Sequence, residues 1–343
     1  MIEQREPVAA TPLLEVRSLS KQFRVGGMLS SHRLHAVRDV SFALPKGGVL
    51  ALVGESGSGK STTARMIARL IRPTAGEILL SGVDQLALEP RHASDTYRRT
   101  VQMVFQDPFS SLNPVHTIGH HLERPVRLHG QATTGRDVQA RIHELLATVG
   151  LTPPEEVAAR YPHELSGGQR QRVALARALA AHPEIVLADE PVSMLDVSIR
   201  IDILNLMERL QRERGLSYLY ITHDLASARY IAPSIAVMYA GYAVEGGPTA
   251  ELLREPAHPY TRRLIGAVPN LALERRRDPA RKRAVPPVLI NPPPGCPFAD
   301  LCPAMMPRCR EVMPGVTHLT DARWVRCHLY GEGEPSPHTN RSE

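Results

Sequence analysis

Four short apolar runs along the chain each end at a glycine loop or at a polar residue. The runs cover residues 49–53, 101–105, 185–188 and 218–222. An unbroken apolar run of this length is typical of a parallel strand that is covered on both faces. In an open parallel sheet the carboxyl ends of the strands share one edge, and ligands bind there. The pattern therefore predicts an α/β fold with a single site at that edge.

The first run leads into a glycine-rich loop. Residues 54–61 read GESGSGKS, which matches G-x-x-x-x-G-K-S/T, and a helical stretch, TTARMIARL, follows and is expected to stop near Pro73. Strand, glycine loop and helix in this order are the context of a phosphate-binding P-loop. Loop N–H groups close around phosphate oxygens, Lys60 neutralises the β and γ phosphates, and the Ser61 hydroxyl binds Mg²⁺. The expected nucleotide-binding residues are Gly54, Glu55, Ser56, Gly57, Ser58, Gly59, Lys60, Ser61 and Thr62.

The other three runs end at residue types that nucleotide hydrolysis uses. They end at Gln106, at the pair Asp189 and Glu190, and at His223. A lone Gln or His after a strand is commonly a loop residue or a helix cap, but two carboxylates at the edge of a buried sheet need a cation or a partner. We expect Asp189 to hold Mg²⁺ with Ser61, and Glu190 to orient or deprotonate the attacking water. His223 is expected to contact the γ-phosphate, and Gln106 to contact the metal or the water.

A second glycine-rich helix start lies about a hundred residues after the P-loop. Residues 165–172 read LSGGQRQR, in which Ser166 and Gln169 match a capping box. Two glycines in a first helical turn are costly if capping is their only role, because Gly costs up to ~1 kcal/mol relative to Ala. A helix N-terminus with free N–H groups is an anion site. Since the chain already has a phosphate loop, we expect Ser166, Gly167, Gly168 and Gln169 to contact a phosphate held by another chain.

The order of these motifs resembles that of the ATP-hydrolysing subunits of ABC transporters. LSGGQ lies between the P-loop and IVLADEP, with MLDVS and ITHD after them, and the resemblance covers about residues 12–270. It implies that ATP is bound in a head-to-tail dimer, where the LSGGQ segment of one subunit closes on the γ-phosphate of the other. It also implies that Phe23 stacks on adenine, with an apolar strand residue as the alternative, and that Asp196 lies at the dimer contact. Met194 replaces the small Ala common in the family, which predicts a looser contact or slower hydrolysis.

The expected fold is α/β. It comprises a P-loop NTPase core with a mostly parallel sheet and helices, an antiparallel β region, a helical subdomain and a small Cys-containing C-terminal extension. The expected limits are 12–105 and 181–268 for the core, 106–180 for the helical subdomain with the signature motif, and 269–343 for a basic linker and the extension. In the family the helical subdomain receives the coupling helix of the membrane subunit. Phe109 and Leu112 would suit that docking if exposed, and would otherwise be core residues.

Composition and charge change this picture little. The 343 residues are 43% hydrophobic and carry a net charge of +6, with much of the excess in RRRDPARKR at 275–283. That run is expected to be a solvated linker, with binding to anionic lipid or nucleic acid as the alternative. The start of the chain lacks the pattern of a secretory signal, and the longest apolar candidate, at 234–244, falls short of the ~18 residues of a membrane span and predicts strands. We expect a peripheral protein at the cytoplasmic face of the inner membrane, held there through partners.

All four cysteines lie in the last fifth of the chain, at Cys296, Cys302, Cys309 and Cys327. The spacing C-x5-C-x6-C-x17-C, with Pro and Gly between, allows tight turns to bring four thiolates together. It lacks the closely spaced pair of structural zinc sites, and it permits a 4Fe–4S cluster without matching a common ferredoxin spacing. His318 and His328 keep zinc open, and unliganded thiols are the third alternative.

The tail after residue 250 resembles the C-terminal extension of the oligopeptide and dipeptide importer ATPases. The resemblance lies in LLREPAHPYTRRLIGAVP, NPPPGCPFADLCPAMMPRCR and RWVRCHL. It implies an ATPase that powers import of peptides or related solutes, with a homologous second ATPase, two transmembrane permease subunits and an external solute-binding protein. A soluble ABC ATPase acting on nucleic acid or ribosomes is the alternative, which the single P-loop and single LSGGQ disfavour. A subunit that binds ATP without hydrolysing it is a further alternative, against which Glu190 and His223 argue.

Overall fold

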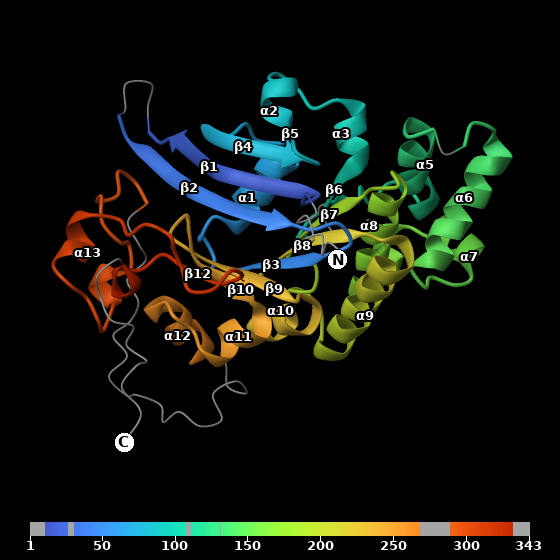
Figure 1. Ribbon diagram of the computed structural model, residues 1–343. Coiled ribbons are helices and arrows are strands. Elements are labelled where there is room, and N and C mark those ends of the chain that lie inside the picture. Colours follow the sequence, from blue (N-terminus) through green and yellow to red (C-terminus); the bar gives the residue numbers. More distant parts are fainter. Residues whose placement is uncertain (1–10, 27–30, 108–110, 131, 268–288, 332–343) are drawn as a thin grey trace, which may run out of the picture.

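A computed structural model of the chain describes residues 11–26, 31–107, 111–130, 132–267 and 289–331. Its strands form two sheets that lie one above the other, with helices above, beneath and at one end (Figure 1). The strands are β1 (Leu14–Arg24), β2 (Arg33–Leu44), β3 (Val49–Val53), β4 (Ala75–Leu80), β5 (Val83–Asp84), β6 (Val101–Val104), β7 (Ile185–Asp189), β8 (Ser217–Thr222), β9 (Ser234–Tyr239), β10 (Tyr242–Pro248), β11 (Thr317–His318) and β12 (Trp324–Val325). The helices are α1 (Lys60–Ile67), α2 (Gln85–Leu88), α3 (Asp95–Thr100), α5 (Ile118–Leu128), α6 (Gly135–Thr148), α7 (Pro154–Ala159), α8 (Gly167–Leu179), α9 (Val197–Arg214), α10 (Leu225–Ile231), α11 (Thr249–Arg254), α12 (Pro259–Ile265) and α13 (Arg308–Glu311).

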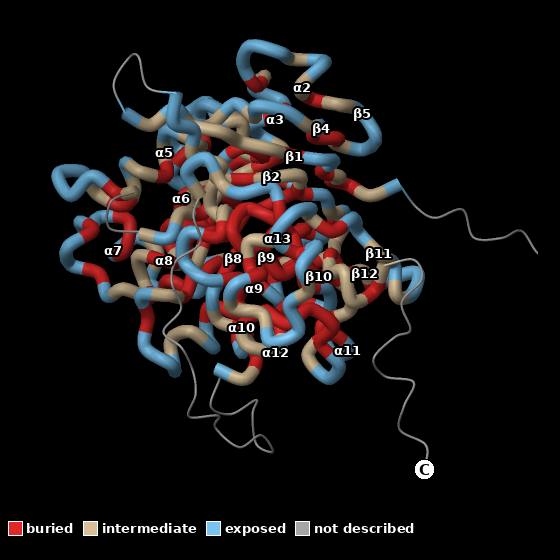
Figure 2. Tube along the Cα trace, turned by 90° about the vertical axis from the view of Figure 1, so that its left-hand side faces the viewer, coloured by how far each residue is buried: buried red, intermediate tan, exposed pale blue. Residues whose placement is uncertain are grey.

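The larger sheet contains the four apolar runs as neighbouring strands. Its order is β11-β12-β10-β9-β3-β8-β7-β6, and the pairs from β9 to β6 are parallel. Alternate residues of β3 face opposite cores: Ala51 and Val53 pack on one side and Leu50 and Leu52 on the other. Figure 2 shows buried positions concentrated in these central strands. The expected α/β fold, with four strand ends at one edge, is confirmed.

The smaller sheet is antiparallel, in the order β2-β1-β4-β5. Its long strands β1 and β2 pack through Leu14, Leu19 and Val40 onto the larger sheet and α1. This layer is the expected antiparallel β region. Strand β2 lies at the edge of this sheet and passes close to the P-loop, since a Cβ on Gly59 would lie 2.5 Å from the carbonyl oxygen of Ala36.

Helices α5, α6 and α7 form a lobe at one end of the molecule (Figure 1), and α8 packs against both that lobe and β6. The N-cap side chains Thr117, Thr134 and Ser166 each accept a backbone N–H bond, which fixes the starts of α5, α6 and α8. Leu112 is only 2% exposed and belongs to the hydrophobic core. An exposed docking role for Leu112 is therefore wrong, because its side chain is already packed, and Phe109 lies outside the described residues.

The C-terminal segment returns to the larger sheet and extends it. Strand β12 pairs with β10, and β11 pairs with β12. The approach is close, because a Cβ on Gly246 would lie 2.6 Å from the Trp324 ring. The predicted strands at 234–244 are β9 and β10, whereas the basic run at 275–283 lies outside the described residues. Among the described residues, the helices are all too short or too polar to span a bilayer.

Candidate functional site

The phosphate loop joins the buried strand β3 to α1. Gly59 caps α1 with φ 106°, and a Cβ there would lie 2.5 Å from the carbonyl oxygen of Ala36, so only glycine fits. Lys60 is buried, and its Nζ donates to the carbonyl oxygens of Gly54 at 2.7 Å and Glu55 at 2.9 Å. Burial lowers the pKa of Lys60, and the nearby carboxylates oppose that shift. The ammonium is thus held inside the loop, where phosphate oxygens would bind.

Ser61 and Asp189 meet at the end of β7. The Ser61 hydroxyl donates to Asp189 Oδ1 at 2.8 Å. Burial raises the pKa of Asp189, and the hydrogen bond from Ser61 partly offsets that rise. A hydroxyl and a carboxylate side by side are hard oxygen ligands of the kind that Mg²⁺ prefers. These two expected metal-binding residues therefore fit the ion.

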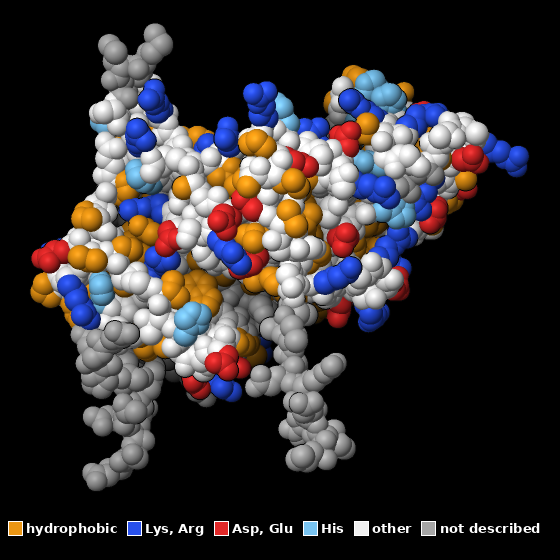
Figure 3. All heavy atoms as spheres, turned by 45° about the horizontal axis from the view of Figure 1, so that its top comes forward, with side chains coloured by type: hydrophobic (Ala, Val, Ile, Leu, Met, Phe, Trp, Pro, Cys, Tyr) orange, Lys and Arg blue, Asp and Glu red, His pale blue; other side chains and the backbone are white. Residues whose placement is uncertain are grey.

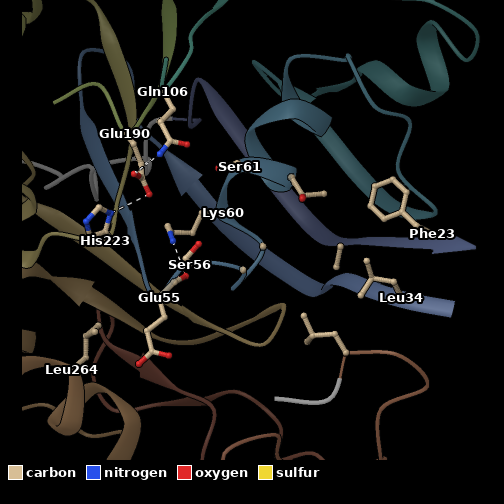
Figure 4. A pocket seen from close by; sticks show the side chains of 15 residues that line it. Phe23, Leu34, Glu55, Ser56, Lys60, Ser61, Gln106, Glu190, His223 and Leu264 are labelled. Atoms are coloured by element: carbon tan, nitrogen blue, oxygen red, sulfur yellow. Dashed lines mark hydrogen bonds and ion pairs between the residues drawn. The ribbon is translucent and has the colours of Figure 1, made fainter. Parts of the chain in front are cut away.

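Glu190, which follows β7, contacts the side chains that follow β6 and β8. Gln106 Nε2 donates to Glu190 Oε2 at 3.0 Å, and His223 Nδ1 lies 3.1 Å from Glu190 Oε1 (Figure 4). The side chain of Glu190 is 11% exposed and that of His223 is 55% exposed. Glu190 has φ 47°, a strained conformation for a residue other than glycine, and its N–H donates to Ile221 at 2.8 Å. The structure thus brings together the three expected catalytic side chains, and it pairs Gln106 with Glu190 rather than with Ser61 and Asp189.

One cavity of about 720 Å³ connects these groups. Its lining includes the loop residues Glu55, Ser56, Gly57, Gly59, Lys60, Ser61 and Thr62, the expected residues Phe23, Gln106, Glu190 and His223, and also Leu34, Ala36, Leu264 and Leu289. The other two loop residues, Gly54 and Ser58, are buried and do not line the cavity. The cavity volume is in the range of small-molecule and cofactor sites.

Sequence reasoning missed the aliphatic part of this lining and one tyrosine behind the loop. The hydroxyl of Tyr260 accepts the backbone N–H of Glu55 at 3.2 Å. Tyr260 lies in LLREPAHPYTRRLIGAVP, the segment that resembles the C-terminal extension of importer ATPases. That resemblance was the only sequence signal that could have pointed to Tyr260. Leu34 and Leu289 belong to no motif, and nothing in their sequence context marks them.

The LSGGQ segment lies outside the cavity lining. The capping box is confirmed, because Ser166 N donates to Gln169 Oε1 at 2.9 Å and Gln169 N donates to Ser166 Oγ at 3.3 Å. A Cβ on Gly168 would lie 2.6 Å from Ile199, and one on Gly167 would lie 3.2 Å from Leu195. Packing within the chain accounts for both glycines, so the glycines by themselves are no evidence for an incoming ligand. Ser166 itself is exposed.

An exposed apolar cluster lies beside the LSGGQ helix. Met194 is 57% exposed, Val197 is 72% exposed and Ile201 is 47% exposed. Asp196, between the first two, is exposed, and its side chain forms no capping hydrogen bond at the start of α9. Neighbouring exposed apolar side chains of this kind are typical of an interface.

The four cysteines line one small cavity of about 20 Å³, together with His328. Burial raises the pKa of Cys296 to about 11 and that of Cys327 to about 12, and neighbouring thiols add to the rise. Nearby backbone groups partly offset the effect of burial and lower the thiol pKa values: those of Phe298 and Ala299 act on Cys296, that of Ala304 on Cys302 and that of Leu329 on Cys327.

The metal expectation for these cysteines is not shown by the structure. Across the part of the chain that the structure describes, no group of three or more His, Cys, Asp or Glu side chains has an arrangement that could hold a metal ion. His318 lines a different pocket, so it does not join the cysteines.

Comparison with known proteins gives consistent matches. Residues 37–193 match the family ABC transporter, and residues 244–309 match the family Oligopeptide/dipeptide transporter, C-terminal region. The chain is 44% identical over 325 residues to the Oligopeptide transport ATP-binding protein AppF of Bacillus subtilis, which covers 93% of this chain and 97% of that protein. It is 48% identical over 279 residues to the Glutathione import ATP-binding protein GsiA of Escherichia coli, which covers 80% of this chain and 44% of that protein.

A solved structure agrees with the fold. The dimeric structure of MJ0796, a bacterial ABC transporter cassette, aligns with a TM-score of 0.59 and 30% identity, covering 69% of this chain and 98% of that one. A second dimeric structure of the same cassette, in a post-hydrolysis state bound to ADP and Pi, aligns equally well.

Proposed function

The chain belongs to the ABC transporter family, and from that premise we propose a role for each part of its site in a peptide importer. The protein is an ATPase coupled to transport, since relatives that match nearly its whole length are oligopeptide transport ATP-binding proteins. The observation that carries the proposed mechanism is the contact of Gln106 and His223 with Glu190, beside Lys60 in one cavity.

The loop and the strand ends divide the chemistry between them. Lys60 and the loop N–H groups bind the β and γ phosphates, and Ser61 with Asp189 would hold Mg²⁺, which supplies positive charge beside the phosphates. Glu190 accepts a proton from water as the water oxygen attacks the γ-phosphorus, and the bond to the ADP oxygen breaks. Gln106 and His223 hold the Glu190 carboxylate in place. The products are ADP and inorganic phosphate.

The site is completed by a second subunit. We assign Ser166, Gly167, Gly168 and Gln169 to the γ-phosphate bound by the partner, and Asp196 to the dimer contact. The exposed positions of Ser166 and Asp196 and the apolar cluster of Met194, Val197 and Ile201 support this arrangement. The proposed partners are a homologous ATPase, two permease subunits and an external solute-binding protein. Through the permease the chain would lie at the cytoplasmic face of the membrane.

Uptake of short peptides tests this function. Cells that lack the chain are expected to lose uptake of a radiolabelled peptide, because import stops without ATP hydrolysis. Wild-type protein should restore uptake, and Glu190→Gln should not. Uptake of a free labelled amino acid serves as the control. Undiminished peptide uptake in the deletion strain would contradict peptide import.

The four cysteines are proposed to hold a 4Fe–4S cluster, with Zn²⁺ as the alternative. The cavity that all four cysteines line supports the proposal. Buried thiols with raised pKa values become thiolates only beside a strong positive charge, which a bound metal would supply.

Metal analysis of anaerobically purified protein tests the cysteine site. We expect about four irons and four acid-labile sulfides per chain. Cys309→Ser should lower that content, whereas Met305→Ser, at an exposed position of the same segment, should not. About one zinc ion per chain, without iron, would show that the cysteines hold Zn²⁺ instead of a cluster. Protein without bound metal would contradict both.

The face of the molecule drawn in Figure 3 offers little support for nucleic acid as a partner. On the face drawn in Figure 3, Lys and Arg side chains are interspersed with Asp and Glu. Nucleic-acid binding usually requires a continuous basic patch or stripe. We therefore retain the importer function.

A further inference from the structure

A short C-terminal segment adds to the edge of the antiparallel sheet. The N–H of His35 donates to Leu289 O at 2.9 Å, and the N–H of Asn291 donates to Arg33 O at 3.0 Å. The N–H of Arg33 also donates to the Asn291 side chain at 3.0 Å. The segment thus pairs with β2, the edge strand, in the manner of an added strand.

The pairing places Leu289 in the wall of the nucleotide cavity. Leu289 lines that cavity with Leu34 and Phe23, and the last two are cross-strand neighbours on β2 and β1. Figure 4 shows Phe23 and Leu34 at one end of the cavity and Glu190 and His223 at the other end. The phosphate loop lies between the two ends. The cavity therefore has a polar end for hydrolysis and an apolar end.

We infer that Leu289 contacts the purine ring of ATP, so that the C-terminal extension supplies one wall of the base subsite. The inference rests on the proposed ATPase function. If the phosphates bind at the P-loop, the purine ring is the part of the nucleotide left for the apolar end of the cavity. The ring is flat and weakly polar, so it suits that end. The Lys21 ammonium lies 4.9 Å from the centre of the Phe23 ring. Leu289 lines the cavity from another segment, beside the end of β1 and the start of β2, where Phe23 and Leu34 lie.

This assignment predicts a particular kinetic effect. The ring takes no part in bond breaking, so its contact with Leu289 is the same in the ground state and in the transition state. Loss of a contact that stabilises the bound substrate and the transition state equally raises KM and leaves kcat unchanged.

Leu289→Ala tests the inference. We expect the Kd and KM for ATP to rise about fivefold, with kcat unchanged, because part of the apolar contact with the ring is lost. Binding of inorganic tripolyphosphate, which has no base, should not change. Ile290→Ala is the matched control, because Ile290 is adjacent, 43% exposed and absent from the lining. Asn291→Ala, which removes a hydrogen bond to β2, should shift the Kd for ATP in the same direction.

The outcomes separate this inference from the ATPase function. An unchanged Kd for ATP in Leu289→Ala would overturn the inference, and so would an equal loss of affinity for ATP and tripolyphosphate. Wild-type protein that neither binds nor hydrolyses ATP would instead overturn the proposed function.

Discussion

Replacing Glu190 by Gln is expected to lower steady-state ATP turnover about a thousandfold while ATP still binds. A general base typically contributes 10²–10⁴-fold to the rate. The Gln side chain has the same shape and can keep the contacts to Gln106 and His223, but its amide cannot take a proton from water. Phosphate release measures turnover, and a fluorescent ATP analogue measures binding. The variant should also remain dimeric in the presence of ATP, since the bound nucleotide is not consumed.

Glu184→Gln is the matched control for this result. Glu184 directly precedes β7, whereas Glu190 directly follows it, so the two carboxylates lie at opposite ends of one strand. Glu184 pairs with Lys46 at the surface, far from the cavity lining. Its replacement should leave turnover within about twofold of wild type, because surface ion pairs contribute little. Equal turnover in wild type and Glu190→Gln would show that Glu190 is not the base.

The parallel strands and their ends were predictable from the sequence. A strand covered on both faces must be apolar throughout, and the first polar residue after it marks the edge of the sheet. This rule gave β3, β6, β7 and β8, and with them Gln106, Glu190 and His223. It did not give the partners of these side chains. Gln106 was expected to contact the metal or the water, and in the structure it donates to Glu190. The sequence could not predict this partner, because the partner depends on side-chain directions that a linear pattern does not contain.

The position of Leu289 in the cavity wall was not predictable. Arg33 and Asn291 are 258 positions apart and meet through backbone groups and one side chain. Strand addition uses hydrogen-bonding groups that every residue except proline has, so it leaves no mark in the sequence. The glycines at 167 and 168 pack against Leu195 and Ile199 of their own chain. The sequence alone did not show this packing, because Leu195 and Ile199 lie about thirty positions further along the chain.

Ser166→Arg is expected to reduce ATP turnover about a hundredfold or more without weakening ATP binding. Ser166 does not line the cavity of its own chain, so the chain's own P-loop is unchanged. In purified protein, where the chain pairs with a second copy of itself, the added side chain would block the approach of each LSGGQ helix to the other copy's γ-phosphate, and loss of one such donor typically costs 10²–10³-fold. Ser94→Arg is the matched control, because Ser94 is the N-cap of α3 and its loss removes only a cap.

The most direct test of the composite site is the ATP turnover of an equimolar mixture of Lys60→Ala and Ser166→Arg proteins, in a preparation where the wild-type chain alone hydrolyses ATP. Each variant by itself should be inactive. In the mixture, half of the dimers contain both variants and each of these keeps one intact site of two, so turnover should recover to about a quarter of the wild-type value. A mixture as inactive as its components would contradict a site shared between two subunits.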